Sequence, residues 1–308
     1  MNAYLSAKSK GEVDMARNKI VLHYDGPIAL DHKVTLRTLG STLSHLQSAI
    51  DRAAIELRYG AVRKHARLKS EDYPLTDFIV GEPKEGGYIL DLANSGPLKI
   101  VDRIHAAVDR AFREASKESL SFTESLAKQA ERRETAITQG AQKAAEIDPV
   151  LLFVDKAAKA LQYADRAINR EVDQMLAQIR LERYEGSILD LQFAGSSTSP
   201  VYRFDKDKAS RFHHVVAERS LGDPLLLQVR FRALDRGTKV RRPVGKAVHA
   251  ETGHTFTIHF RSPESFNSVT KYMRAGDPPL VSIIACPVLE YGTFDAEAGD
   301  MFFLGLAE

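Results

Sequence analysis

The sequence is poor in residues that crosslink a protein or give it a bulk charge. One cysteine, Cys286, stands among 308 residues, which excludes an internal disulfide and gives no support for an oxidising compartment. Its neighbours in residues 281–285 are mostly apolar, so we expect a buried, unreactive thiol. The 43 basic and 41 acidic residues leave a net charge of +2. That balance excludes attraction of the whole molecule to nucleic acid by bulk charge, so any such role must be local.

Enzyme and membrane signatures are missing as well. The sequence has no Walker phosphate loop, no glycine-rich dinucleotide fingerprint, no zinc helix and no nucleophile elbow. No apolar stretch approaches the roughly 18 to 20 residues that span a bilayer, and the first residues lack a signal-peptide core. We therefore expect a cytoplasmic protein without a cofactor, and we lean against an enzyme.

Three histidines come nearest to a metal site. His249, His254 and His259 lie close to Glu251, and imidazole suits zinc or iron. The tight ligand spacing of structural metal sites is missing, however, and strand alternation would put His254 and His259 on opposite faces. The sequence therefore predicts no metal site.

An N-terminal α+β unit is predicted for residues 1–195, with a small sheet and long helices. Residues 19–24 are rich in β-branched side chains and favour a strand, and apolar residues at spacings of three and four predict a helix over residues 34–59. Gly60 is a plausible cap for that helix. Strands at 75–80 and 88–92 flank a glycine-rich turn and predict a hairpin.

A helical region is expected from about residue 98 to 184. Its strongest feature is a seam of apolar residues that alternates threes and fours and needs a partner helix. The weaker stripe over residues 122–144 could supply that helix as an antiparallel hairpin, which we favour, and a second copy of the chain could supply it instead. The seam residues for such a homo-oligomer are Val150, Val154, Leu161, Ile168, Met175 and Ile179.

A short internal similarity links two predicted strands. Residues 85–92 resemble residues 185–191, since each begins with Glu-Gly and continues into an alternating Leu-Asp-Leu strand. One explanation of the similarity is that Glu-Gly commonly precedes a strand. The other is a duplication in which the strand at 187–193 joins the N-terminal sheet. The glycine and serine residues of 195–200 are then predicted to be a linker between two domains.

The C-terminal part, residues 201–308, reads as a small β-barrel. After a short polar helix at 205–219, the predicted order is strand, strand, strand, helix, strand, strand. That is the element order of a five-stranded OB-fold, which commonly binds oligonucleotides on its second and third strands and the adjacent loops. An SH3-like or other small barrel would give a similar order.

A cluster of cations lies between the first two strands of that barrel. Cations concentrated there would meet a phosphate backbone and release its counterions. Phe256, Tyr272 and Tyr291 are candidate stacking partners, although alternation places Phe256 in the core. A solvated basic loop without a ligand, or one paired with the acidic terminal segment that carries Glu290 and Asp300, is the alternative. The candidate nucleic-acid-binding residues are Arg230, Arg232, Arg236, Lys239, Arg241, Arg242 and Lys246.

A second basic cluster occupies residues 63–69. It follows the predicted helix at 34–59 and reads as an exposed loop. We regard it as a further candidate for contact with an anionic partner.

The N-terminal hundred residues resemble an uncharacterised bacterial family known as a domain of unknown function. The motifs that carry the resemblance are Ile20-Val21-Leu22-His23-Tyr24-Asp25-Gly26, Leu39-Gly40-Ser41-Thr42-Leu43-Ser44-His45-Leu46 and Glu85-Gly86-Gly87-Tyr88. The resemblance implies a bacterial or phage setting, such as a mobile element or an antiviral defence locus. It transfers no catalytic residue.

Three functional hypotheses follow. The leading one is a non-enzymatic binding protein whose C-terminal barrel contacts nucleic acid through the basic loop. The second is a homo-oligomeric assembly, sensor or scaffold protein that binds another protein, motivated by the helical seam. The third is an enzyme without a familiar motif, for which Asp91, Asp190 and the histidines are the candidates and no roles are assigned.

Overall fold

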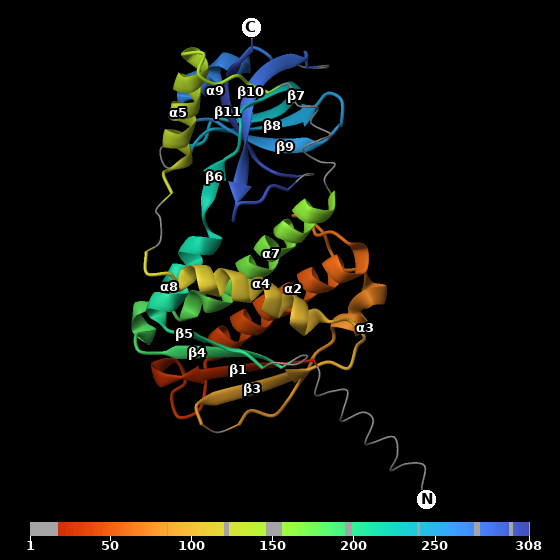
Figure 1. Cartoon of the computed structure of the whole chain (residues 1–308), viewed down its shortest axis with the longest axis vertical. Coiled ribbons are helices and arrows are strands. Elements are labelled where there is room, and N and C mark those ends of the chain that lie inside the picture. Colours follow the sequence, from red (N-terminus) through yellow and green to blue (C-terminus); the bar gives the residue numbers. More distant parts are fainter. Residues whose placement is uncertain are drawn as a thin grey trace, which may run out of the picture. The chain divides into compact units, whose positions relative to one another are not determined.

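A computed structural model describes residues 18–84, 86–119, 123–145, 156–194, 199–238, 241–273, 278–295 and 298–307, with only the backbone of 156–162. The chain forms two compact units (Figure 1). Unit 1 comprises Met1–Leu120 and Ala160–Ala217, and unit 2 comprises Ser121–Lys159 and Glu218–Glu308. The expected α+β fold with a small C-terminal barrel is confirmed.

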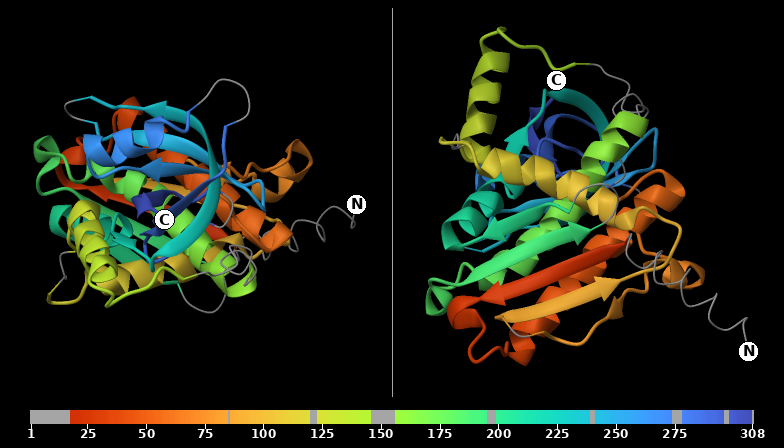
Figure 2. Two further views of the ribbon diagram at one scale, coloured as in Figure 1. Left: turned by 90° about the horizontal axis from the view of Figure 1, so that it is seen from above. Right: turned by 60° about the horizontal axis from the view of Figure 1, so that its bottom comes forward.

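Unit 1 is built on an antiparallel five-stranded sheet in the order β2-β3-β1-β4-β5. The side chains of β1 alternate, with Ile20, Leu22 and Tyr24 buried, because successive side chains point to opposite faces of a sheet. Figure 2 shows the helices on one side of this sheet. The strands are β1 (Lys19–Asp25), β2 (Ile79–Val80), β3 (Tyr88–Ala93), β4 (Ile188–Ala194) and β5 (Val201–Phe204).

The helices of unit 1 begin and end where capping chemistry allows. Thr35 accepts a hydrogen bond from the Thr38 amide at the start of the first long helix, and Gly60 ends it in the left-handed conformation at φ +76°. Asp205 caps the last helix in the same manner as Thr35. The helices are α2 (Leu36–Tyr59), α3 (Tyr73–Thr76), α4 (Ile100–Ala115), α7 (Lys156–Met175) and α8 (Lys206–Val216).

The partner of the seam helix differs from the prediction. Helix α5 (Leu126–Thr138) belongs to unit 2, whereas the described part of α7 from Ala160 onward belongs to unit 1 and packs against α2 and α4. Helix α7 buries apolar side chains over several turns, among them Ala164, Ile168 and Val172, whereas Ala130 is the buried residue of α5.

The seam residues are accordingly covered within one chain where they are described. Ile168, Met175 and Ile179 have exposed fractions of 0%, 1% and 0%. Val150, Val154 and the side chain of Leu161 lie outside the described residues. The homo-oligomer stays a prediction, and these three buried residues are not available to it.

The prediction that residues 195–200 link two domains is wrong. Strand β5 pairs antiparallel with β4, so the segment joins two neighbouring strands of one sheet. Glycine and serine suit a tight reversal as well as a flexible linker, and the sequence alone did not separate the two. The domain boundary therefore falls after Ala217, not at residues 195–201. The strand expected at 187–193 does join the N-terminal sheet, beside β1.

Unit 2 is a closed barrel with the strand order of an OB-fold. Strand β7 pairs with β8, β8 with β9, β9 in parallel with β11, β11 with β10, and β10 again with β7. A helix separates the third and fourth of these strands, as in OB-folds. The elements are β6 (Arg219–Leu221), β7 (Leu225–Asp235), β8 (Val244–His249), β9 (Thr255–His259), α9 (Pro263–Thr270), β10 (Val281–Glu290) and β11 (Met301–Leu306).

Helix α5 covers one outer wall of this barrel. Its Ala130 packs in a cluster with Leu221, Cys286 and Phe302 of β6, β10 and β11. The side chain of Gln129 accepts a hydrogen bond from the Leu221 amide at 2.8 Å. Another wall of the barrel is formed by β7, β8 and β9.

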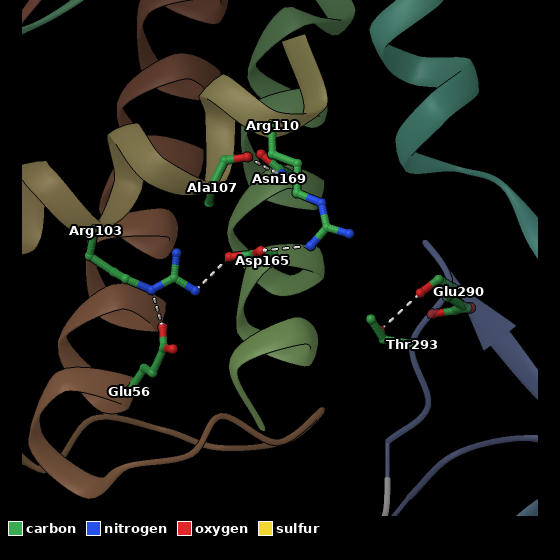
Figure 3. Close-up of polar contacts among 8 residues, drawn as sticks. All are labelled: Glu56, Arg103, Ala107, Arg110, Asp165, Asn169, Glu290 and Thr293. Carbon is green, nitrogen blue, oxygen red and sulfur yellow. Dashed lines mark hydrogen bonds and ion pairs between the residues drawn. The ribbon is translucent and has the colours of Figure 1, made fainter. Parts of the chain in front are cut away.

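A buried ionic network ties the helices of unit 1 together (Figure 3). The guanidinium of Arg103 on α4 lies 2.5 Å from Glu56 on α2 and 2.6 Å from Asp165 on α7. Burial raises the pKa of Glu56 above its usual range, and Arg103 opposes that shift. Asn169 adds a hydrogen bond to the Ala107 carbonyl at 3.0 Å. Arg103 therefore bridges carboxylates from two other helices, and Arg110 lies 3.8 Å from the second of them, Asp165.

Replacing this arginine should weaken unit 1 strongly. We expect Arg103→Met to lower the free energy of unfolding by about 3 kcal/mol, because the buried Glu56 loses its partner and Asp165 keeps only the more distant Arg110. Arg113→Met on the same helix is the matched control, since Arg113 is 78% exposed and pairs with Asp109, and it should cost less than about 1 kcal/mol. Urea unfolding followed by circular dichroism measures both. Equal losses of unfolding free energy in the two variants would show that the network stabilises unit 1 no more than an exposed ion pair does.

The cysteine thiol should be inert in the native protein. Cys286 is fully buried, and this burial raises the pKa of its thiol to about 12. At pH 8 a maleimide should label the native chain slowly and the urea-unfolded chain at the rate of a free thiol, because the thiolate is the nucleophile. Thr255→Cys adds an exposed thiol and should be labelled at once in native protein. Rapid native labelling at Cys286 would contradict the prediction.

Candidate nucleic-acid interface

The outer wall of β7, β8 and β9 positions the predicted cations. We call this wall the barrel face. In register across it, Arg230 faces Val248 and then Thr255, and Ala233 faces Lys246 and then Thr257. Inward neighbours such as Phe231 and Ala247 are fully buried, so alternation turns the polar members outward.

A β-bulge places one of the arginines. The pairing steps from Phe231–Ala247 to Ala233–Lys246, which leaves Arg232 as the extra residue. Arg232 and Ala233 are both exposed, and Leu234 packs against the barrel core again. A bulge inserts a residue without reversing the inward set of side chains. It therefore directs Arg232 to solvent beside the exposed Lys246.

Hydrogen bonds within the loop from β7 to β8 link its residues to one another. Asp235 accepts a hydrogen bond from the Gly237 amide at 2.9 Å, and the Thr238 amide donates to the Arg241 carbonyl at 2.9 Å. Gly237 adopts φ +73°, and a Cβ there would lie 2.2 Å from the Arg241 carbonyl oxygen. The described part of the loop therefore favours glycine at position 237.

Most of the predicted site residues are brought together by this loop and the strands beside it. Arg236, Arg241 and Arg242 are exposed on the loop, next to Arg232 and Lys246. Arg241 lies 4.0 Å from Asp235, with both side chains more than half exposed, and such a surface pair contributes little. These guanidinium groups can therefore meet an anion with little cost from lost partners.

Two predicted residues stand apart. Arg230 is half-buried and donates to the Pro278 carbonyl at 2.7 Å, so it supports the segment before β10. Lys239 lies outside the described residues.

The acidic terminal segment does not need the basic loop for its partners. Glu290 pairs with Arg219 at 2.8 Å, and Asp300 lies 3.1 Å from His259. Asp295 is buried, and its side chain accepts from the Ala298 amide. These contacts engage the acidic residues within their own part of the barrel.

Two of the three expected aromatic partners serve the core, and the third lies in a turn. Phe256 and Tyr272 are partly buried and pack against the barrel core, as alternation predicted for Phe256. Tyr291 adopts φ +53° beside Gly292 in the tight turn from Glu290 to Thr293, where two backbone hydrogen bonds close the reversal (Figure 3). This turn explains why the last strand begins at Met301 and not at residue 291.

Threonines on the barrel face were missed by the sequence reasoning. Thr255 is exposed and Thr257, which faces Lys246, is half-exposed. Hydroxyl groups contact phosphate oxygens in many protein–DNA interfaces. The alternation of threonine with Phe256 and Ile258 was the signal that could have found them.

The histidines are engaged in ordinary hydrogen bonds. His249 is buried and lies 3.2 Å from the Thr252 hydroxyl, and His259 faces Asp300. Within the described part of the chain, no group of three or more histidine, cysteine or acidic side chains is arranged to hold a metal ion. Among those residues, no helix is both long and apolar enough to cross a bilayer.

Comparison with known proteins adds no functional argument. No family model matches the chain, and no curated protein matches it. Among solved structures, the chain has a weak likeness to a mutant of the ferredoxin protease FusC in complex with Arabidopsis ferredoxin. The identity is 14%, the match covers 82% of this chain and 30% of that chain, and the TM-score is 0.15. A likeness at that score carries no argument about fold or function.

The loop geometry predicts a large difference between two glycines. Gly237→Ala should destabilise unit 2 by at least about 1 kcal/mol more than Gly253→Ala. Both positions have φ near +70°, which costs a side chain roughly 1–2 kcal/mol, but Gly253 has nothing within 4 Å and Gly237 faces two carbonyl oxygens. Urea unfolding of the two variants measures the difference. Equal costs would mean that the loop backbone relaxes freely.

Proposed function

We propose that this protein is a non-enzymatic binding protein whose C-terminal barrel contacts the phosphate backbone of nucleic acid. The observation that supports the proposal is the group of exposed arginines on the β7–β8 loop, Arg236, Arg241 and Arg242, beside Arg232 and Lys246. Arginine suits phosphate because its planar fork can donate two parallel hydrogen bonds. A cytoplasmic, bacterial defence or mobile-element setting is part of this proposal.

The barrel favours backbone contact over reading of bases. Its exposed groups include cations and hydroxyls, which position a nucleic acid without specifying its sequence. Phe256 and Tyr272 pack against the core, so these two rings are poorly placed for stacking. We therefore propose an interaction that depends strongly on salt and weakly on sequence.

Neutralising the loop tests the proposal. The triple variant Arg236→Gln, Arg241→Gln, Arg242→Gln should lower affinity at low salt and reduce the slope of log K against log salt by about 2 to 3, because each phosphate contact contributes about 0.7 to 0.9. Fluorescence anisotropy with single-stranded and duplex oligonucleotides across a salt series measures this on the full chain.

A matched control removes equal charge elsewhere in unit 2. Lys128→Gln, Arg132→Gln, Lys143→Gln changes three exposed cations on and just after α5, the helix that covers the other wall of the barrel. It should leave the salt slope nearly unchanged. If the loop variant binds as the parent protein does, the proposal fails and protein–protein assembly becomes the better candidate.

A further inference from the structure

Unit 1 carries a second cationic surface at the end of α2 and the start of α3. We call residues 58–73 the α2–α3 segment. It holds six basic or imidazole side chains and two carboxylates, and it follows α2 in the orange part of the chain in Figure 1. The basic and imidazole residues are Arg58, Arg63, Lys64, His65, Arg67 and Lys69.

The backbone of the α2–α3 segment is anchored from beneath. Val62 is buried, and Ala66 and Leu68 pack against the same cluster, which includes Ile55 of α2 and residues of α7. The Arg52 guanidinium donates to the Ala66 carbonyl at 2.7 Å. A turn closes from the Ala66 amide to the Arg63 carbonyl at 3.0 Å. Apolar residues therefore face inward while Arg63, Arg67 and Lys69 are exposed.

Two exposed aromatic rings lie among these cations. Tyr59 is 46% exposed and Tyr73 is 53% exposed. Asp72 places the ring of Tyr59, because it accepts a hydrogen bond from the Tyr59 hydroxyl, and Tyr73 is the next residue in the chain. The Lys69 ammonium lies 5.7 Å from the centre of the Tyr59 ring.

Each of the two carboxylates in the segment lies near a basic side chain of the segment. Asp72 is 3% exposed and lies 3.6 Å from the Arg58 guanidinium. Glu71 is exposed and lies 3.6 Å from Lys69. The surface that remains combines exposed rings with cations, which is the combination that binds single strands.

We infer that the α2–α3 segment is a binding surface for single-stranded nucleic acid. Phosphates lie against Arg63, Arg67 and Lys69, and unpaired bases stack on Tyr73 and on the ring of Tyr59. The inference rests on the proposed function in naming nucleic acid as the ligand class, but it uses different residues. It assigns stacking to unit 1, whereas the barrel face lacks a suitably exposed ring among its described residues.

The test is made on Tyr73, whose ring can be removed without disturbing Asp72. Full-length protein is titrated into a labelled oligothymidylate of about 20 nucleotides and into an abasic oligomer of equal length, since sites on such proteins span roughly 4–16 nucleotides. Tyr73→Leu should weaken binding of oligothymidylate by about 5- to 150-fold, the range for loss of one stacked base. Tyr73→Phe keeps the ring and should bind as the parent does. The abasic oligomer should not distinguish the three proteins.

A charge variant gives an independent measurement. Arg63→Gln, Arg67→Gln, Lys69→Gln should lower the salt slope for oligothymidylate by about 2, while the α5 triple variant leaves it unchanged. Unchanged thermal melting curves confirm that each variant is folded. Equal affinity of Tyr73→Leu and Tyr73→Phe would overturn the inference, and so would equal binding of abasic and base-containing oligomers by the parent protein.

The outcomes separate this inference from the proposed function. If the β7–β8 loop variant binds normally and the α2–α3 variants do not, the barrel proposal fails and the inference stands. If only the loop variant loses affinity, the α2–α3 surface is not a binding site. Loss in both sets supports two contact surfaces on one protein.

Discussion

The pairing of β1 with β4 is the constraint on which the rest of the architecture depends. Strand β1 is the centre of the unit 1 sheet, and its neighbour on one side is β4, so that Ile20 lies opposite Phe193. The chain must leave unit 1 after α4, contribute α5 to unit 2, and return through α7 to complete the sheet. The chain then forms β5 and α8 of unit 1, and from Glu218 onward it belongs to unit 2. Three crossings join the two units as a result.

This connectivity explains why each unit needs residues from two stretches of the chain. Unit 1 receives α7, whose Asp165 and Asn169 hold α4, and β4, whose Leu191 and Phe193 are buried in the sheet. The barrel receives α5 as a cover for its β10–β11 wall. The exposed cations lie elsewhere on the barrel, on β7, β8 and the loop that joins them.

Local features of the fold could be predicted from the sequence, and long-range partners could not. Apolar spacing and Gly60 defined α2, and alternation defined β7, because these signals reside in neighbouring residues. The partner of α7 depends on which surfaces fit in three dimensions, and a strip of apolar residues does not specify this. The glycine and serine residues before Pro200 suit both a linker and a tight reversal, so the β4–β5 pairing was hidden as well.

The candidate site shows the same limit. The exposed arginines of the β7–β8 loop could be named in advance because the turn composition already indicated a loop. The bulge at Arg232 could not be predicted, since it depends on the pairing register of β7 with β8. Tyr59 belonged to the predicted helix at 34–59, and its exposure follows from how the helix end meets Asp72. Side-chain exposure near an element's end is a tertiary property.

The β1–β4 pairing also has a consequence for biosynthesis. Strand β1 leaves the ribosome about 170 residues before its partner, a delay on the order of ten to thirty seconds at ordinary translation speeds. During that interval its hydrogen-bonding edge and its apolar Ile20 and Leu22 lack one of their two native neighbours. Exposed strand edges are templates for wrong pairing between chains. The nascent chain is therefore a natural client for chaperones until β4 emerges and the central strand is enclosed.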